Sequence, residues 1–255
     1  MPSYKQSLTS LHSAVLLFAL SGLFAKWLNM PATHIVFGRA FFAALTLALF
    51  ILLIKKQSLY LTRSLFLPLM LTGIVLAFHW GSFFYAIQVS SVAIGLITFA
   101  SFPVFVSFLE PILFKERFHY LALVQALFII LGIYLILPLG ELSIDIINGA
   151  FWGVLSAFSF ALLTLLNRKF VAKISAKKVA FYQHSCATLC LLPIIILSPI
   201  TITSSQLTVL VVLGVVFTAL AHSLFNHSLK VVKAHTASIA ISLEPIYGIV
   251  AAYFL

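Results

Sequence analysis

Charged residues are scarce in this chain. Asp, Glu, Lys and Arg together make up 8% of the 255 residues, whereas about 25% is usual in a soluble domain. Hydrophobic residues make up 63%, and the mean hydropathy is +1.19. This composition excludes an ordinary water-soluble domain, and it predicts that most of the chain lies in a lipid bilayer.

Aspartate and cysteine are especially rare. Asp145 is the single aspartate, which excludes an intramembrane aspartyl protease because that chemistry needs two. Cys186 and Cys190 stand one helical turn apart, and we interpret them as small packing residues at a helix interface. They support neither a disulfide scaffold nor a zinc site. The sequence also lacks a His-Glu-x-x-His motif, a Gly-x-Ser-x-Gly elbow and a phosphate-binding glycine loop. We therefore predict no enzyme activity, no metal and no cofactor.

Long apolar runs dominate the sequence instead. A helix needs about 20 apolar residues to cross a bilayer, and nine runs of about that length are present. They are Leu11–Asn29, Thr33–Ile54, Phe66–Ile87, Ser90–Phe114, Tyr120–Pro138, Ile147–Asn167, Val179–Ser198, Leu207–Ser228 and Ala234–Leu255. The predicted fold is an all-α membrane protein, a polytopic helical bundle.

The basic residues indicate how this bundle is oriented. Thirteen of the 15 Lys and Arg residues share one side of the membrane if the amino terminus is cytoplasmic. They are Lys5, Lys55, Lys56, Arg63, Lys115, Arg117, Arg168, Lys169, Lys173, Lys177, Lys178, Lys230 and Lys233. Such a bias is typical of cytoplasmic loops. It predicts a multi-pass protein of the cell (inner) membrane with a cytoplasmic amino terminus, and the net charge of +10 is then no sign of nucleic-acid binding.

Two parts of the sequence correspond at a fixed distance. Pro103, inside an apolar run, corresponds to Pro245, which lies 142 residues later, and the same shift carries Trp80 onto His222. A duplicated block of helices with a matched internal proline is typical of secondary transporters. Their binding site lies where broken helices of the two repeats meet at mid-membrane.

The duplication divides the chain into residues 1–140 and 146–255. The first part holds five predicted spans, an odd number, so the second part would enter the membrane from the opposite side. The repeats are therefore predicted to be inverted. The second part shows four spans before Leu255, so a tenth helix is expected and is missing from this sequence.

The whole chain resembles the EamA family of the drug/metabolite transporter superfamily. The resemblance rests on the order and spacing of Phe37-Gly38-Arg39-Ala40, Val89 to Val104, Phe114-Lys115-Glu116, Asn148-Gly149-Ala150 and Ser242-Leu243-Glu244-Pro245. It implies a permease of two inverted five-helix repeats that moves a small organic metabolite by alternating access, more often exporting amino acids or related metabolites. An importer of a nucleotide-type metabolite, a membrane-embedded enzyme and a sensor remain as alternatives.

Pro103 and Pro245 are the predicted helix breaks. Each removes the backbone donor that would pair with the carbonyl four residues earlier, at Phe99 or Ile241. In lipid, such a carbonyl must be satisfied by protein or by water in a cavity. We expect the broken helices to line the substrate path, and a packing kink without a ligand role is the alternative.

Two charged residues inside the spans are candidates for substrate binding. Glu244 stands near mid-membrane, where a charge costs at least ~2.5–3.5 kcal/mol on insertion scales. Arg39, a proton or a cationic group of the substrate would offset that cost, and a structural role of the carboxyl is the alternative. Arg39 is expected about six residues below the outer surface, shallow enough to snorkel, either as a clamp for a substrate carboxylate or as a brace between helices. Glu110 is expected to be an interfacial anchor.

Aromatic and histidine side chains complete the predicted site. The internal shift places Trp80 and His222 at similar depths in opposed helices. A cavity lining of mixed aromatic and polar character is predicted, with lipid contact or core packing as the alternative for any one member. Its members would be Trp80, Phe83, Phe84, Tyr85, His222 and His227.

The predicted orientation can be tested with single cysteines in a variant that lacks Cys186 and Cys190. Because the basic loops stay in the cytoplasm, an impermeant thiol reagent should label Ser143→Cys from outside and Ser175→Cys from inside. Labelling of position 143 from inside only, or of position 175 from outside, would contradict this topology.

Overall fold

The computed structural model describes residues 2–115 and 143–254, and between these ranges only residues 118, 124, 127–128, 131–132 and 135. The described residues form helices and connecting turns without a strand. The prediction of an all-α membrane bundle is therefore confirmed. The predicted span Tyr120–Pro138 falls on a stretch that is largely outside the described residues.

The helices follow one another closely along the chain. They are α1 (Tyr4–Ser21), α2 (Phe24–Trp27), α3 (Ala32–Leu49), α4 (Arg63–Val89), α5 (Val92–Phe99), α6 (Phe102–Phe114), α8 (Ile144–Val171), α9 (Ala176–Leu197), α10 (Ser204–Gly214), α11 (Ala221–Ser228), α12 (Ala234–Ile241) and α13 (Glu244–Phe254). Two π-helical segments interrupt this pattern: η1 (Phe50–Ile54) continues α3, and η2 (Val215–Leu220) joins α10 to α11.

Six stretches of the described chain are long and apolar enough to cross a membrane. They are Ala32–Ile54, Arg63–Val89, Val92–Phe114, Ile144–Val171, Ala176–Leu197 and Ser204–Ser228. Large apolar side chains such as Leu71 and Leu189, each 63% exposed, remain on their outer faces. Lipid tails solvate such surfaces without the cost that water would impose.

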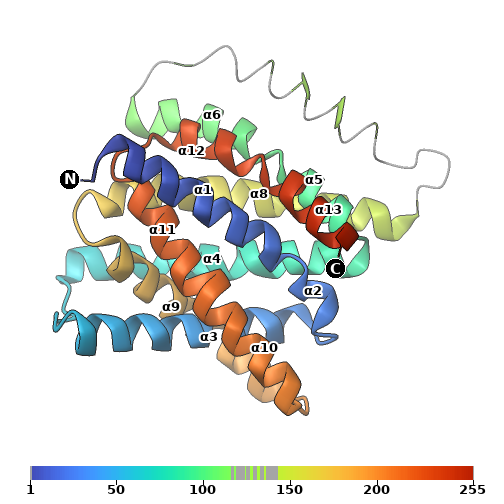
Figure 1. Ribbon diagram of the computed structural model, residues 1–255, viewed down its shortest axis with the longest axis horizontal. Coiled ribbons are helices and arrows are strands. Elements are labelled where there is room, and N and C mark those ends of the chain that lie inside the picture. Colours follow the sequence, from blue (N-terminus) through green and yellow to red (C-terminus); the bar gives the residue numbers. More distant parts are fainter. Residues whose placement is uncertain are drawn as a thin grey trace.

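Most helices run lengthwise, and the α10–η2–α11 stretch crosses them at an angle (Figure 1). Helix α8 packs against α4 and against α5 and α6, while α9 packs against both α3 and α4. Helix α1 lies against α11 and α13, and α12 lies against α6. The interior is therefore enclosed by helices from both ends of the sequence.

Two of the expected spans are broken in the middle at corresponding places. The first break separates α5 from α6 at Ala100 and Ser101, and the second separates α12 from α13 at Ser242 and Leu243. The bounds next to each break and the start of each pair follow one another by 142 residues, from 92 to 234, from 99 to 241 and from 102 to 244. Pro103 and Pro245 are each the second residue of the helix that follows the break, where a proline needs no backbone donor.

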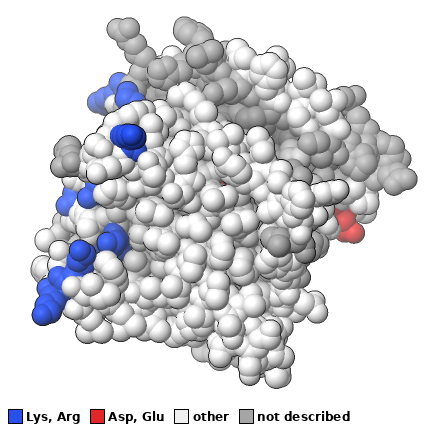
Figure 2. Space-filling model, viewed as in Figure 1, with Lys and Arg blue, Asp and Glu red and all other residues white. Residues whose placement is uncertain are grey.

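Charged side chains collect at the two ends of the bundle. Lys and Arg gather at the end that carries the amino terminus, and acidic atoms appear at the opposite end (Figures 1 and 2). The middle of the visible surface is nearly free of charged atoms (Figure 2). Such a distribution suits a bundle whose midsection lies in hydrocarbon.

Close helix contacts depend on glycine at a few positions. A Cβ atom added to Gly73 on α4 would come within 2.8 Å of the backbone oxygen of Gln183 on α9, and it would also overlap the side chain of Cys186. Gly81, about two turns further along the same helix, has nothing within 4 Å of an added Cβ. Membrane helices approach closely where such small residues meet.

We expect Gly73→Ala to destabilise the bundle by about 1–3 kcal/mol, because α4 and α9 must move apart to admit the methyl group. The matched control Gly81→Ala adds the same methyl group to the same helix and should leave stability nearly unchanged. Thermal unfolding in detergent, followed by circular dichroism, measures both. Equal melting temperatures for the two variants would contradict the close contact at Gly73.

Candidate functional site

A small cavity lies where seven helices meet. Its lining residues come from α1, α3, α4, α5, α8, α11 and α13, and they are Phe18, Ser21, Arg39, His79, Trp80, Phe83, Phe99, Phe160, His222 and Glu244. The centre of a water molecule can reach about 20 Å³ of this space, which is room for about one water. A metabolite could therefore enter only if the helices around the cavity separate.

Arg39 on α3 brings a buried positive charge to the cavity. Its Nε donates a hydrogen bond to Thr218 Oγ1 at 3.0 Å, and its Nη2 donates to the carbonyl oxygen of Phe217 at 3.5 Å. Its guanidinium carbon lies 4.2 Å from the ring centre of Trp80 and 5.1 Å from that of Phe84. These contacts leave other guanidinium donors for a ligand, since the group has five.

The expectation that Arg39 snorkels to the surface is wrong. The side chain is 1% exposed, because η2 and α4 cover it on both sides. Cation–π contact and a hydroxyl acceptor replace part of the water that a surface guanidinium would keep. Arg39 thus joins α3 to η2 while it also faces the cavity.

Glu244 brings a carboxyl group to the same cavity. It is 4% exposed and is the first residue of α13, so the partial positive charge of that helix end acts on it. Its carboxyl group has no hydrogen bond or ion pair within 4.0 Å to the residues that the structure describes, although the charge of Arg39 is close enough to act on it. Arg39 and Glu244 therefore face one space without forming a direct ion pair.

Trp80 and His222, which the internal shift of 142 residues relates, are in contact. Their ring centres are 5.1 Å apart in an edge-on arrangement, and both side chains are almost fully buried. His184 on α9 lies against both rings, at 5.4 Å from Trp80 and 5.1 Å from His222. The Nδ1 atom of His222 and both ring nitrogens of His184 are buried, and no described residue is a hydrogen-bond partner to them.

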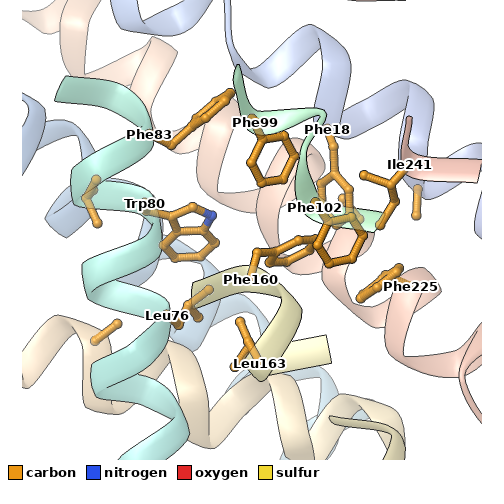
Figure 3. Packing of buried hydrophobic residues seen from close by; sticks show 14 of the residues in the cluster. Phe18, Leu76, Trp80, Phe83, Phe99, Phe102, Phe160, Leu163, Phe225 and Ile241 are labelled. Atoms are coloured by element: carbon orange, nitrogen blue, oxygen red, sulfur yellow. The ribbon is translucent and has the colours of Figure 1, made fainter. Parts of the chain in front are cut away.

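Phenylalanine rings fill the space beside this polar group. Figure 3 shows Trp80 and Phe83 on one side of the cluster, Phe99 and Phe160 in its middle, and Phe18 on the far side. Ring centres of Phe99 and Phe160 lie 5.7 Å apart, and those of Phe18 and Phe160 lie 6.3 Å apart. The cavity thus has an aromatic wall in addition to its charged residues.

His79 is a lining residue that sequence reasoning did not select. Its Nδ1 lies 2.8 Å from Ser156 Oγ and 3.1 Å from the carbonyl oxygen of Ser156, and its ring stacks on Phe160 at 4.6 Å. Phe18, Phe99 and Phe160 were also not selected. Nothing in the sequence distinguishes these three phenylalanines from the others in the spans, apart from the position of Phe99 four residues before Pro103.

Phe84, a predicted member of the lining, is buried next to Arg39 and does not border the cavity. Two further predicted members lie elsewhere. Tyr85 is 40% exposed and packs against Trp152 at 5.8 Å, because it is rotated along α4 away from the face that carries Trp80. His227 lines a separate hollow at the basic end of the bundle. Neither residue borders the cavity.

Pro103 and Pro245 do not line the cavity themselves. Each instead is the second residue of the helix after a break, and a residue that flanks the break does line the cavity: Phe99 precedes the first break and Glu244 follows the second. The role of both breaks in a substrate path remains a hypothesis.

Glu110 is not the interfacial anchor that its position suggests. It is 4% exposed and its Oε1 accepts hydrogen bonds from Arg168 Nη1 at 2.6 Å and from the backbone of Ala234 at 3.1 Å. Its Oε2 accepts from the backbone of His235 at 3.0 Å. A single carboxylate thus joins α6 to α8 and to the first turn of α12.

Comparison with known proteins assigns this architecture to a family. The sequence model of the EamA-like transporter family matches residues 8–137 and 147–255. A solved crystal structure superimposes with a TM-score of 0.75 over 99% of this chain and 90% of that chain, at 16% sequence identity. At that identity the likeness shows the fold alone.

Relatives of known sequence carry transporter names. "Uncharacterized transporter YxxF" of Bacillus subtilis is 28% identical over 97% of this chain and 82% of its own length. The S-adenosylmethionine uptake transporter of Rickettsia prowazekii is 25% identical over 93% of this chain and 80% of its own length. With the family match across both halves and the helical membrane-spanning fold, these findings give one conclusion: the chain is a multi-pass membrane transporter that belongs to the EamA-like transporter family.

Proposed function

We propose that this transporter exports amino acids or closely related zwitterionic metabolites. In this proposal Glu244 binds the ammonium group of the substrate and Arg39 binds its carboxylate. The observation that carries the proposal is that these two opposite charges face one buried cavity without pairing to each other. The aromatic wall would accept the apolar part of the substrate.

The cost of burying charge supports this assignment. A charge near the bilayer centre costs at least ~2.5–3.5 kcal/mol on insertion scales, and a direct ion pair would be the simplest compensation. Arg39 instead turns part of its guanidinium to Thr218 and Trp80, and the carboxyl group of Glu244 has no bonded partner among the described residues. A zwitterionic substrate between them would give each of the two side chains a partner of opposite charge.

The aromatic side chains fit the same class of substrate. The rings of Trp80 and Phe18 offer apolar surface and electron-rich faces, and such faces attract ammonium and sulfonium groups. A lining of this kind selects poorly among side chains, so we expect several amino acids to compete. The two charges would favour compounds that carry both a free ammonium and a free carboxylate over those that lack either group.

Alternating access is the proposed mechanism, with residues 1–140 and 146–255 acting as two inverted repeats. The breaks before α6 and α13 supply short helices that could tilt independently of their partners. Glu110 would hold the end that carries the basic residues closed while the other end opens, since it ties α6 to α8 and α12. We further propose that this basic end is cytoplasmic.

Uptake of a nucleotide-type metabolite is the second candidate. It is favoured by the relatives named as S-adenosylmethionine uptake transporters. S-Adenosylmethionine carries an ammonium, a carboxylate, a sulfonium and an aromatic base, so the same two charges would serve it. Counterflow with labelled amino acids and with labelled S-adenosylmethionine in proteoliposomes distinguishes the substrates. The direction then follows from the sidedness of transport driven by an imposed gradient.

Replacement of Glu244 by Gln should leave membrane insertion intact but lower transport about tenfold or more, because the substrate ammonium loses a charged hydrogen-bond partner. The remaining activity should also lose any dependence on pH that the carboxyl group causes across roughly pH 5 to 8. Initial rates in proteoliposomes at matched protein levels measure both effects.

Asp145→Asn is the matched control, since it neutralises an exposed carboxylate in the first turn of α8 that does not line the cavity. It should transport at the parent rate. Equal rates and equal pH profiles for Glu244→Gln and the parent would reduce Glu244 to a structural carboxyl and remove the basis of the proposed site.

Thr218 is proposed to position Arg39 without touching the substrate. Thr218→Val removes the acceptor of the Arg39 Nε hydrogen bond, and we expect a several-fold higher KM for an amino acid with little change for the amine that lacks its carboxylate. Thr208→Val, which alters an exposed hydroxyl bonded to Ser204, is the control. If both substrates lose affinity equally, Thr218 has a general structural role and does not act through the carboxylate.

A further inference from the structure

A second hollow opens at the basic end of the bundle, away from the central cavity. It has a volume of about 400 Å³ and lies between α1, the start of α9, η2 and α11. We call it the basic hollow, and its lining residues are Ser10, Ser175, Ala176, Lys177, Leu220, Ser223, Leu224, His227 and Lys230. Nothing in the proposed transport step uses these residues.

Among the residues that the structure describes, none neutralises the positive charge in the basic hollow. The charges of Lys177 and Lys230 both act on His227, and the charge of Lys55 acts on Lys177, so these groups are close together. The lining contains no acidic residue, and the described Glu110, Asp145 and Glu244 all lie elsewhere. A group of like charges around an open space attracts an anion.

A buried hydroxyl and a helix end indicate the shape of that anion. Ser223 is 8% exposed and lines the hollow, yet its hydroxyl has no hydrogen-bond partner in the described part of the chain. The first turn of α9 also borders the space at Ser175, Ala176 and Lys177, and the amino-terminal end of a 22-residue helix favours negative charge. Several donors around one space suit the oxygens of a phosphate group.

The apolar side of the basic hollow indicates where such a phosphate comes from. Leu220, which is 48% exposed, and Leu224 form that side, on a stretch apolar enough to span the membrane. The hollow therefore offers positive charge and polar donors next to leucines that face the bilayer. This is the pattern of a phospholipid at the membrane surface, with its headgroup in the polar part and its acyl chains along the leucines.

We propose that the basic hollow binds the headgroup of an anionic phospholipid, with Lys177 and Lys230 contacting the phosphate and Ser223 donating a hydrogen bond to it. The site is separate from the central cavity and does not depend on which metabolite is transported. Because α1 and α11 border both spaces, a bound lipid would also brace two helices of the cavity wall.

Titration of the purified protein in non-ionic detergent tests this proposal. The probes are short-chain phosphatidylglycerol, phosphatidylcholine of the same chain length and inorganic phosphate, and the readouts are the dissociation constant and the rise in melting temperature. We expect saturable binding of phosphatidylglycerol, with far weaker binding of phosphatidylcholine and of phosphate. The double variant Lys177→Gln/Lys230→Gln should bind phosphatidylglycerol about twentyfold more weakly, since each lysine near a lipid headgroup contributes about a fivefold factor.

Lys169→Gln/Lys173→Gln is the matched control, because it removes two exposed charges from the same loop region outside the hollow. It should bind phosphatidylglycerol as the parent does. Ser223→Ala, a smaller change that preserves folding, should weaken binding several-fold.

Three results would overturn the proposal. Equal losses in both double variants would mean diffuse attraction to a basic surface, and equal binding of phosphatidylcholine would mean apolar contact alone. Full affinity for inorganic phosphate would mean a site for soluble anions and not for lipid.

Discussion

A guanidinium group enclosed by an apolar bundle is the constraint on which the interior of this protein depends. Lipid offers no water to Arg39, so neighbouring helices must supply its partners. Thr218 and the carbonyl of Phe217 come from η2, and the ring faces of Trp80 and Phe84 come from α4. A substitution that removes one of these partners therefore leaves part of the guanidinium group unsolvated, because no water is present to replace the partner. The positions of α3, α4 and η2 are coupled through this one side chain.

The broken helices follow from the same scarcity of water. A backbone interruption inside lipid is tolerated where its polar groups meet protein or a cavity. Both interruptions satisfy this requirement in part with short local hydrogen bonds. Ser101 donates its backbone N–H to Thr98, and Leu243 donates to Ala240. Glu244 can begin a helix in the membrane because the helix end favours negative charge and Arg39 lies nearby.

Sequence reasoning predicted the helical bundle and much of the cavity, for identifiable reasons. Glu244 and Arg39 stood out because charge is costly in an apolar run, and Trp80 and His222 stood out because the internal shift related them. All four line or border one space. The prediction for Tyr85 came from its proximity in sequence to Trp80, and the 3.6-residue period of the helix turns it outward.

The remaining members of the cavity could not be predicted from one sequence. Phe18 and Phe160 lie on α1 and α8, and their contact depends on how distant helices cross. Glu110 was judged by its neighbours in sequence, whereas its partners at Ala234 and His235 are more than 120 residues away. Periodicity and local charge contain no information about such pairs.

The π-helical segment η2 determines which face of α11 meets the cavity. A π-helix accommodates one more residue per turn than the ladder of an α-helix, and within η2 the hydroxyl of Thr218 accordingly reaches back five residues to the carbonyl of Leu213. One residue fewer in Val215–Leu220 would restore a regular helix and rotate everything after it by about 100°. His222 would then leave the cavity. Related transporters with a regular helix here should therefore align with this chain only through a gap of a single residue.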